Sequence, residues 1–344
     1  MGPSQEQNQA LTHASTPSHQ AKPRRTGWWR RRRFLIPAGL VLAAVLVFSW
    51  SMRSPSPVGH WDSAEGQDRF LNAYDESFTD MPETAETFDI RTDFGVVRAY
   101  QFEGQGDGPP SVLLPGRASA SPVWADNMAS LLALGDVYTI DLLGEPGRSV
   151  QERPITNDAD QAAWLNQVLL QLPPDQFHVM GLSIGGWTAA NLALHHPESV
   201  TAMTLIDPVF VFDDMPLETV LRSIPAAFSW MPKSWRDGFN SYTAGGAPVE
   251  DVPVAEMIEA GMQHYSLRLP QPTRISEDQL TELELPVLAI IASESVMLDA
   301  EDAAQTAERA LPAGTVRVYE GASHAVSGEE PEQIAQDVLD FLAD

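Results

Sequence analysis

Cysteine is absent from this chain of 344 residues. Its absence excludes a disulfide framework, thiol chemistry and any metal site with cysteine ligands. The chain also lacks internal repeats, so repeat architectures are not expected. No motif implies a metal ion or an organic cofactor, and we predict that the protein needs neither.

Basic residues are scarce beyond residue 52. Residues 53–344 contain fourteen Lys or Arg and forty-six Asp or Glu, whereas residues 1–52 contain seven and one. An acidic body of this kind repels phosphate backbones, so nucleic-acid binding is not expected. We interpret the acidity as a solvated surface that keeps the protein soluble; selection of cationic substrates is the alternative.

One long apolar run breaks this pattern. Residues 34–52 carry no charge over nineteen positions, which is just enough to cross a hydrocarbon core of ~30 Å. Arginines cluster at 24–33, and tryptophans stand near both ends of the run. We predict a disordered, basic, cytoplasmic tail at 1–33 and a single-pass membrane anchor at 34–52, with the body outside the cytoplasm. The alternatives are a cleaved signal peptide, which would make the protein secreted, and a twin-arginine export signal at 31–35.

Beyond a linker and helix at 53–84, short apolar runs alternate with helical patterns. This alternation predicts a mostly parallel sheet that is covered by helices on both faces, within one domain at 85–344. A hairpin is expected at 87–102. The expected strands then lie at 112–114, 137–140, 177–180, 200–206, 287–291 and 316–319, and the helices at 122–134, 158–171, 186–195, 299–310 and 332–342.

About seventy residues interrupt the alternation, at 209–280. They are rich in proline and in bulky apolar groups, including Phe228, Trp230 and Trp235. The segment predicts a helical cap that forms an apolar pocket above the strand ends. A second small core is the other interpretation, and both can hold.

The most informative motif is Gly181-Leu-Ser183-Ile-Gly185, which follows an apolar run and precedes an alanine-rich helical pattern. This is the setting of a nucleophile elbow, in which a serine occupies a strained turn between strand and helix. Gly181 and Gly185 are expected where side chains would collide with neighbouring backbone.

The order of these parts resembles the α/β-hydrolase superfamily over about residues 85–344. Within it, the chain is similar to capped bacterial carboxylesterase-like hydrolases. This resemblance implies the α/β-hydrolase fold and ester hydrolysis through a serine. The segments that carry it are Val112-Leu-Leu-Pro-Gly-Arg-Ala-Ser-Ala-Ser-Pro-Val-Trp124, Tyr138-Thr-Ile-Asp-Leu-Leu-Gly-Glu-Pro-Gly-Arg-Ser149, the elbow, Leu205-Ile-Asp-Pro208 and Gly321-Ala-Ser-His324.

A serine hydroxyl becomes a nucleophile only when a base removes its proton. His324 is the expected base, because it follows the last expected strand, where the superfamily places this residue. The acid that orients the imidazole is less clear. The family's acid would fall at about Ser295, which cannot serve. We favour Asp207, with Glu294 as the alternative; Asp299 is more plausibly a helix N-cap.

Two backbone N–H groups are expected to stabilise the oxyanion. The first belongs to Ile184, directly after the nucleophile. The resemblance assigns the second to Arg117, with Ala118 as its nearest rival. The chain departs from the family here, because Pro115-Gly116 stands where His-Gly is usual.

The sequence thus predicts a membrane-anchored serine hydrolase that cleaves small apolar carboxylic esters through an acyl-serine intermediate. One alternative is a surface binding protein that keeps the scaffold but has impaired catalysis, as Ser295 and Pro115 could indicate. Lactonase, thioesterase, amidase or perhydrolase variants of the same chemistry are also open.

Overall fold

A computed structural model describes residues 56–226 and 231–343. The tail and the anchor that we predict at 1–33 and 34–52 lie outside the described residues. Within the described ranges, no helix combines the length and the apolar character needed to cross a bilayer.

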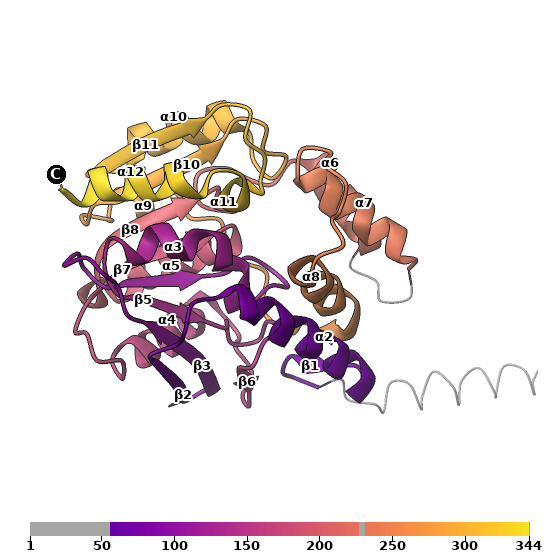
Figure 1. The fold of residues 1–344 in the computed structure, drawn as a ribbon. Coiled ribbons are helices and arrows are strands. Elements are labelled where there is room, and N and C mark those ends of the chain that lie inside the picture. The colour runs from indigo at the N-terminus through magenta and orange to yellow at the C-terminus, as the bar shows by residue number, and fades with distance from the viewer. Residues whose placement is uncertain (1–55, 227–230, 344) are drawn as a thin grey trace, which may run out of the picture. The chain divides into compact units, whose positions relative to one another are not determined.

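A nine-stranded sheet forms the centre of the described domain (Figure 1). Its order is β11-β10-β8-β7-β4-β5-β3-β2, with β6 paired to β3. The strands from β11 to β5 pair in parallel, and β3 is antiparallel to β5, β2 and β6. The strands are β2 (Glu86–Thr92), β3 (Gly95–Phe102), β4 (Ser111–Leu114), β5 (Val137–Ile140), β6 (Val150–Gln151), β7 (Phe177–Leu182), β8 (Val200–Ile206), β10 (Val287–Ala292) and β11 (Gly314–Tyr319).

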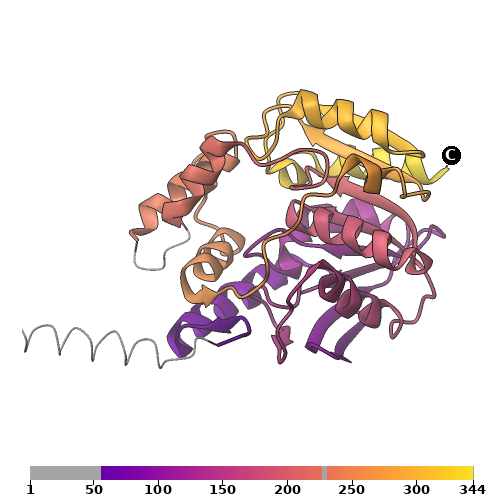
Figure 2. The same ribbon diagram turned by 180° about the vertical axis from the view of Figure 1, so that it is seen from behind.

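Helices cover both faces of the sheet (Figures 1 and 2). The core beneath one face includes side chains of α4 (Asp158–Leu169), α5 (Ile184–His195) and α10 (Ala300–Ala310). The core beneath the other includes those of α2 (Ala64–Ser77), α3 (Ala125–Leu132) and α12 (Pro331–Ala343). Shorter helical segments are η1 (Phe78–Asp80), η2 (Ser121–Trp124), η3 (Pro197–Ser199), α9 (Glu277–Leu280) and α11 (Val326–Glu329).

The helices on both faces of the sheet explain the apolar runs in the sequence. In β10, Val287, Ala289 and Ile291 contribute to the first core. Their neighbours Leu288 and Ile290 contribute to the second. Because alternate side chains point to opposite faces, a strand that is buried on both sides must be apolar at every position. The predicted fold class is confirmed, as is each predicted strand and the hairpin.

We refer to the segment at 209–280 as the cap. It contains α6 (Leu217–Ala226), α7 (Lys233–Thr243), α8 (Pro253–His264) and the short strand β9 (Tyr265–Ser266). The sequence analysis did not predict how the amino-terminal segment joins this cap. β1 (His60–Trp61) pairs antiparallel with β9, and Arg69 of α2 reaches Glu259 of α8 at 2.7 Å.

A buried ion pair joins two helices of the cap. Arg236 of α7 and Glu259 of α8 approach to 2.7 Å, and each side chain is only 1% exposed. Arg69 and Arg236 together therefore surround one carboxylate, which offsets the cost of removing it from water. The cap has a polar core of its own besides its apolar contacts.

Helix α6 has one buried side and one exposed apolar side. Thr219 is fully buried, and its hydroxyl donates to the Val296 carbonyl. The opposite side of the helix is apolar and faces solvent, and the exposed fractions of its four side chains range from 38% to 72%. These side chains are Leu217, Val220, Leu221 and Ile224.

Candidate active site

Ser183 stands on a sharp turn between β7 and α5. Its backbone has φ 56° and ψ −116°, a conformation that is strained for any residue other than glycine. A Cβ atom at Gly181 would lie 2.2 Å from the Gly185 carbonyl oxygen, and one at Gly185 would lie 2.2 Å from the Leu114 carbonyl oxygen. The prediction that both glycines avoid backbone collisions is confirmed.

The structure brings Ser183, His324 and Asp207 together. The Nε2 atom of His324 lies 2.9 Å from the Ser183 Oγ, and its Nδ1 lies 2.5 Å from the Asp207 Oδ2. The Asp207 side chain is fully buried, and the His324 side chain is 14% exposed. Ser183 follows β7, Asp207 follows β8 and His324 follows β11. Because these strands are parallel, the three residues lie at the same end of the sheet, where the strands terminate.

Asp207 is held by hydrogen bonds as well as by burial. Its Oδ1 accepts from the Ala292 N–H at 3.1 Å, and its Oδ2 accepts from the Ser295 hydroxyl at 2.6 Å. Its backbone has φ 42°. Hydrogen bonds to a carboxylate stabilise its charged form. Ser295 is therefore a partner of the acid, a role that the sequence analysis missed.

The other acidic residues lie elsewhere. Glu294 is exposed, and His324 contacts Asp207 instead. Asp299 caps α10 by accepting from the Asp302 N–H at 3.1 Å, as expected for an N-cap. The geometry therefore favours Asp207 over Glu294 as the acid, because Asp207 is the carboxylate that contacts the imidazole.

His178 is a core residue. It is fully buried, with Ser111 Oγ 3.1 Å from Nδ1 and Thr204 Oγ1 2.8 Å from Nε2. Burial lowers the pKa of His178 to about 3, because a charged imidazole cannot be solvated there. The ring stays neutral and belongs to the fold.

The loop after β4 lies against the nucleophile. A Cβ atom at Gly116 would lie 3.8 Å from the Ser183 Cβ. The Ala118 N–H already donates to Glu145 Oε2 at 3.2 Å. The N–H groups of Arg117 and Ile184 have no acceptor among the described residues. This geometry favours Arg117 over Ala118 as the second donor to an oxyanion.

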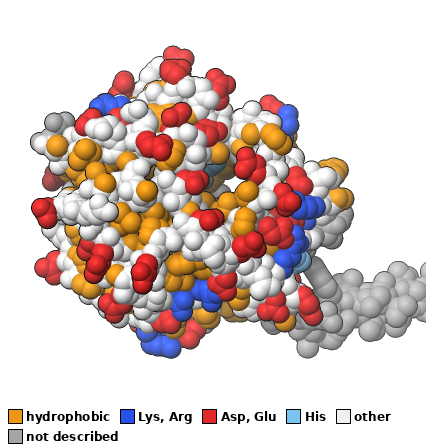
Figure 3. All heavy atoms as spheres, in the orientation of Figure 1, with side chains coloured by type: hydrophobic (Ala, Val, Ile, Leu, Met, Phe, Trp, Pro, Cys, Tyr) orange, Lys and Arg blue, Asp and Glu red, His pale blue; other side chains and the backbone are white. Residues whose placement is uncertain are grey.

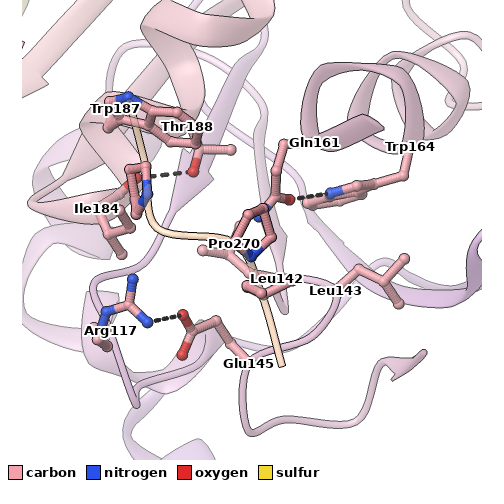
Figure 4. A pocket seen from close by; sticks show the side chains of 12 residues that line it. Arg117, Leu142, Leu143, Glu145, Gln161, Trp164, Ile184, Trp187, Thr188 and Pro270 are labelled. Atoms are coloured by element: carbon pink, nitrogen blue, oxygen red, sulfur yellow. Dashed lines mark hydrogen bonds and ion pairs between the residues drawn. The ribbon is translucent and has the colours of Figure 1, made fainter. Parts of the chain in front are cut away.

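A small cavity adjoins this loop (Figure 4). It encloses about 10 Å³, room for about one water molecule. Arg117 and Glu145 form an ion pair at its edge, with 3.1 Å between Nη1 and Oε1. Gln161 and Thr188 are further polar members of its wall, and the apolar members are Leu142, Leu143, Trp164, Ile184, Trp187, Leu269, Pro270 and Pro272.

Acidic side chains are spread over the face drawn in Figure 3, where the surface is hollowed beside the cap. Among residues 56–226 and 231–343, no three His, Asp or Glu side chains are grouped so as to hold a metal ion.

The fold and the site together define the class of protein. A parallel sheet, a serine on a strained strand–helix turn, and a histidine between that serine and a buried carboxylate are the features of an α/β hydrolase with a serine nucleophile. A family model described as the alpha/beta hydrolase fold matches residues 109–247. The chain therefore has the α/β-hydrolase fold.

Several relatives are bacterial carboxylesterases. The chain is 27% identical to carboxylesterase YbfK of Bacillus subtilis over 282 residues, which are 80% of this chain and 93% of the relative. The crystal structure of CesB (YbfK) covers 81% of this chain and 99% of its own, with a TM-score of 0.73 and 26% identity. That of naproxen esterase, also from Bacillus subtilis, has a TM-score of 0.75 at 24% identity and the same coverage.

The elbow glycine provides the first prediction. Gly185→Ala places a methyl group against the Leu114 and Pro115 carbonyl oxygens. We expect the free energy of unfolding to fall by more than about 2 kcal/mol, with loss of activity. Chemical denaturation and an ester assay measure both effects.

Gly238 supplies the matched control. It lies exposed inside α7, and a Cβ atom there would meet nothing within 4 Å. Gly238→Ala should raise stability by about 0.5–1 kcal/mol and leave activity unchanged. Equal stability of the two variants would contradict the proposed collision.

The second prediction concerns the acid. Asp207→Asn removes the charge that faces the imidazole, and we expect kcat to fall by roughly 10³- to 10⁴-fold while the protein stays folded. Glu294→Gln is the control and should change kcat by less than about twofold. Steady-state kinetics and thermal melts on both variants decide; equal kcat values would rule out Asp207.

Proposed function

We propose that this protein is a serine hydrolase that cleaves carboxylic esters through an acyl-serine intermediate. The observation that carries the proposal is the His324 imidazole, placed between the Ser183 hydroxyl and the Asp207 carboxylate. The carboxylesterase relatives support the same reaction.

In the first half-reaction, the Ser183 Oγ attacks the ester carbonyl carbon while His324 Nε2 accepts its proton. The Asp207 carboxylate stabilises the imidazolium that forms. The N–H groups of Ile184 and Arg117 donate to the oxyanion of the tetrahedral intermediate. As the intermediate collapses, the C–O bond to the alcohol breaks and His324 returns the proton to the leaving oxygen.

The second half-reaction repeats these steps with water. His324 removes a proton from a water molecule, which attacks the acyl carbon. The tetrahedral intermediate then expels the Ser183 oxygen, which regains its proton from His324. The products are an alcohol and a carboxylic acid, and no cofactor takes part in this scheme.

The substrate that fits best is a small apolar ester. The cavity beside Ile184 and Arg117 supports this proposal, because it is small and has apolar side chains in its wall. The exposed apolar side of α6 adds an apolar surface on the cap. Ser295, which suggested impaired catalysis, supports the acid by its hydrogen bond to Asp207.

A fluorophosphonate probe and a series of p-nitrophenyl esters test the proposal. Wild type should be labelled and should hydrolyse the acetate and butyrate esters faster than the decanoate ester. Ser183→Ala should show neither labelling nor turnover, because it lacks the oxygen that bonds to phosphorus or carbon. A folded wild type that is neither labelled nor active on any ester would refute the proposal.

We also propose that residues 34–52 anchor the protein in a membrane, with the catalytic domain on the extracytoplasmic side. The charge-free run and the arginines before it support this topology. A carboxy-terminally tagged full-length protein should sediment with membranes and resist carbonate extraction. A soluble product that begins near residue 52 would show cleavage instead, and its release would contradict the anchor.

A further inference from the structure

The loop after β4 holds a strained residue without the histidine that usually organises it. Ala118 has φ 57°, a left-handed conformation that costs about 1–2 kcal/mol for a residue with a Cβ atom. Pro115-Gly116 occupies the positions where the resemblance would place His-Gly. Some other group must therefore hold the loop in the shape that exposes the Arg117 N–H.

Glu145 is in the right place to do so. It follows β5, and its side chain is 3% exposed. One carboxylate oxygen accepts from the Ala118 N–H at 3.2 Å, and the other lies 3.1 Å from the Arg117 Nη1. Figure 4 shows Arg117 and Glu145 reaching toward each other across the cavity edge. One side chain thus contacts two consecutive residues of the loop.

The remaining contacts of the loop lie further from the N–H of Arg117. The Ser119 hydroxyl donates to the Gly116 carbonyl at 2.8 Å. Asp141 accepts from the Ser121 N–H at 2.9 Å and from its hydroxyl at 2.7 Å. Asp141 therefore fixes the end of the loop, while Glu145 is the carboxylate that engages its strained centre.

The charge of Glu145 has a consequence for catalysis. A carboxylate one peptide unit from an oxyanion donor repels the negative charge that develops in the transition state. The Arg117 guanidinium, which is 43% exposed, pairs with that carboxylate. Arg117 can thus offer its backbone N–H to the oxyanion while its side chain neutralises Glu145.

We propose that Glu145 is a positioning residue for the oxyanion hole: it orients the Arg117 N–H through its hydrogen bond to the Ala118 N–H. The Arg117 side chain compensates the charge of Glu145. This inference rests on the proposed ester hydrolysis, and it adds a residue to the machinery of that site.

A set of four variants tests the two roles, with kcat and KM for p-nitrophenyl acetate and the melting temperature as readouts. Glu145→Ala removes the acceptor and should lower kcat by about 100-fold, with KM changed by less than about threefold. Glu145→Gln keeps a carbonyl oxygen at the same reach and should cost only about threefold in kcat.

Arg117→Met leaves the Glu145 charge uncompensated and should lower kcat by about tenfold. The double variant Arg117→Met/Glu145→Gln removes that charge, so its kcat should recover to the level of Glu145→Gln. This non-additivity is the signature of charge compensation. It gives a result even if Glu145→Ala fails to fold.

Glu152 provides the matched control. It forms an Arg–Glu pair of the same 3.1 Å length with Arg91, but both side chains are at least half exposed. Glu152→Ala and Glu152→Gln should leave kcat unchanged.

Two results would overturn the inference. One is a kcat of Glu145→Ala equal to that of Glu145→Gln. The other is additive behaviour of the Arg117 and Glu145 changes. An inactive wild type, in contrast, would contradict the proposed ester hydrolysis itself. If that wild type is still labelled by the fluorophosphonate probe, the affinity of the same variants for a trifluoromethyl ketone, whose adduct with Ser183 carries an oxyanion, reports on Glu145; a wild type that is not labelled overturns both proposals.

Discussion

The site depends on a close approach between two stretches of backbone. The carbonyl oxygen of Leu114, at the end of β4, lies only 2.2 Å from where a Cβ atom of residue 185 would be, and a Cβ atom at Gly181 would lie 2.2 Å from the Gly185 carbonyl oxygen. Because no side chain separates them, the turn that carries Ser183 and the loop that carries Arg117 lie side by side. The Ser183 hydroxyl and the N–H groups of Ile184 and Arg117 are therefore close together. Covalent catalysis on a carbonyl group requires such an arrangement of nucleophile and oxyanion donors.

The carboxylate that contacts the imidazole follows a different strand from the one that the resemblance implies. β8 and β10 are neighbours, with Ile206 opposite Ile290, and the Asp207 N–H donates to the Ile290 carbonyl at 2.8 Å. Residues that follow either strand therefore converge on the same imidazole. The resemblance placed the acid after β10, but here the carboxylate follows β8 and a serine after β10 donates to it. The acid and its supporting group are drawn from the same two strand ends.

The cap contacts the amino-terminal segment as well as the sheet domain. Strand β1 pairs with β9, and Arg69 of α2 shares Glu259 with the buried Arg236 of α7. Loss of Glu259 would be costly, because it would leave the buried Arg236 guanidinium without a carboxylate partner. Helix α2 thus contacts the cap and also contributes to the core beneath the sheet.

The sequence by itself was enough to predict the fold class, and it gave Ser183 and His324 as the candidate nucleophile and base. Apolar runs of strand length between helical patterns require a doubly covered parallel sheet, and the spacing of Gly181, Ser183 and Gly185 requires the strained turn. Only the tertiary structure showed that His324 contacts Asp207 and not Glu294, and only it showed the contacts that Ser295 and Glu145 make. The physical reason is that a hydrogen bond depends on distances between strand ends far apart in the chain, whereas periodicity and turn chemistry are local properties of the sequence.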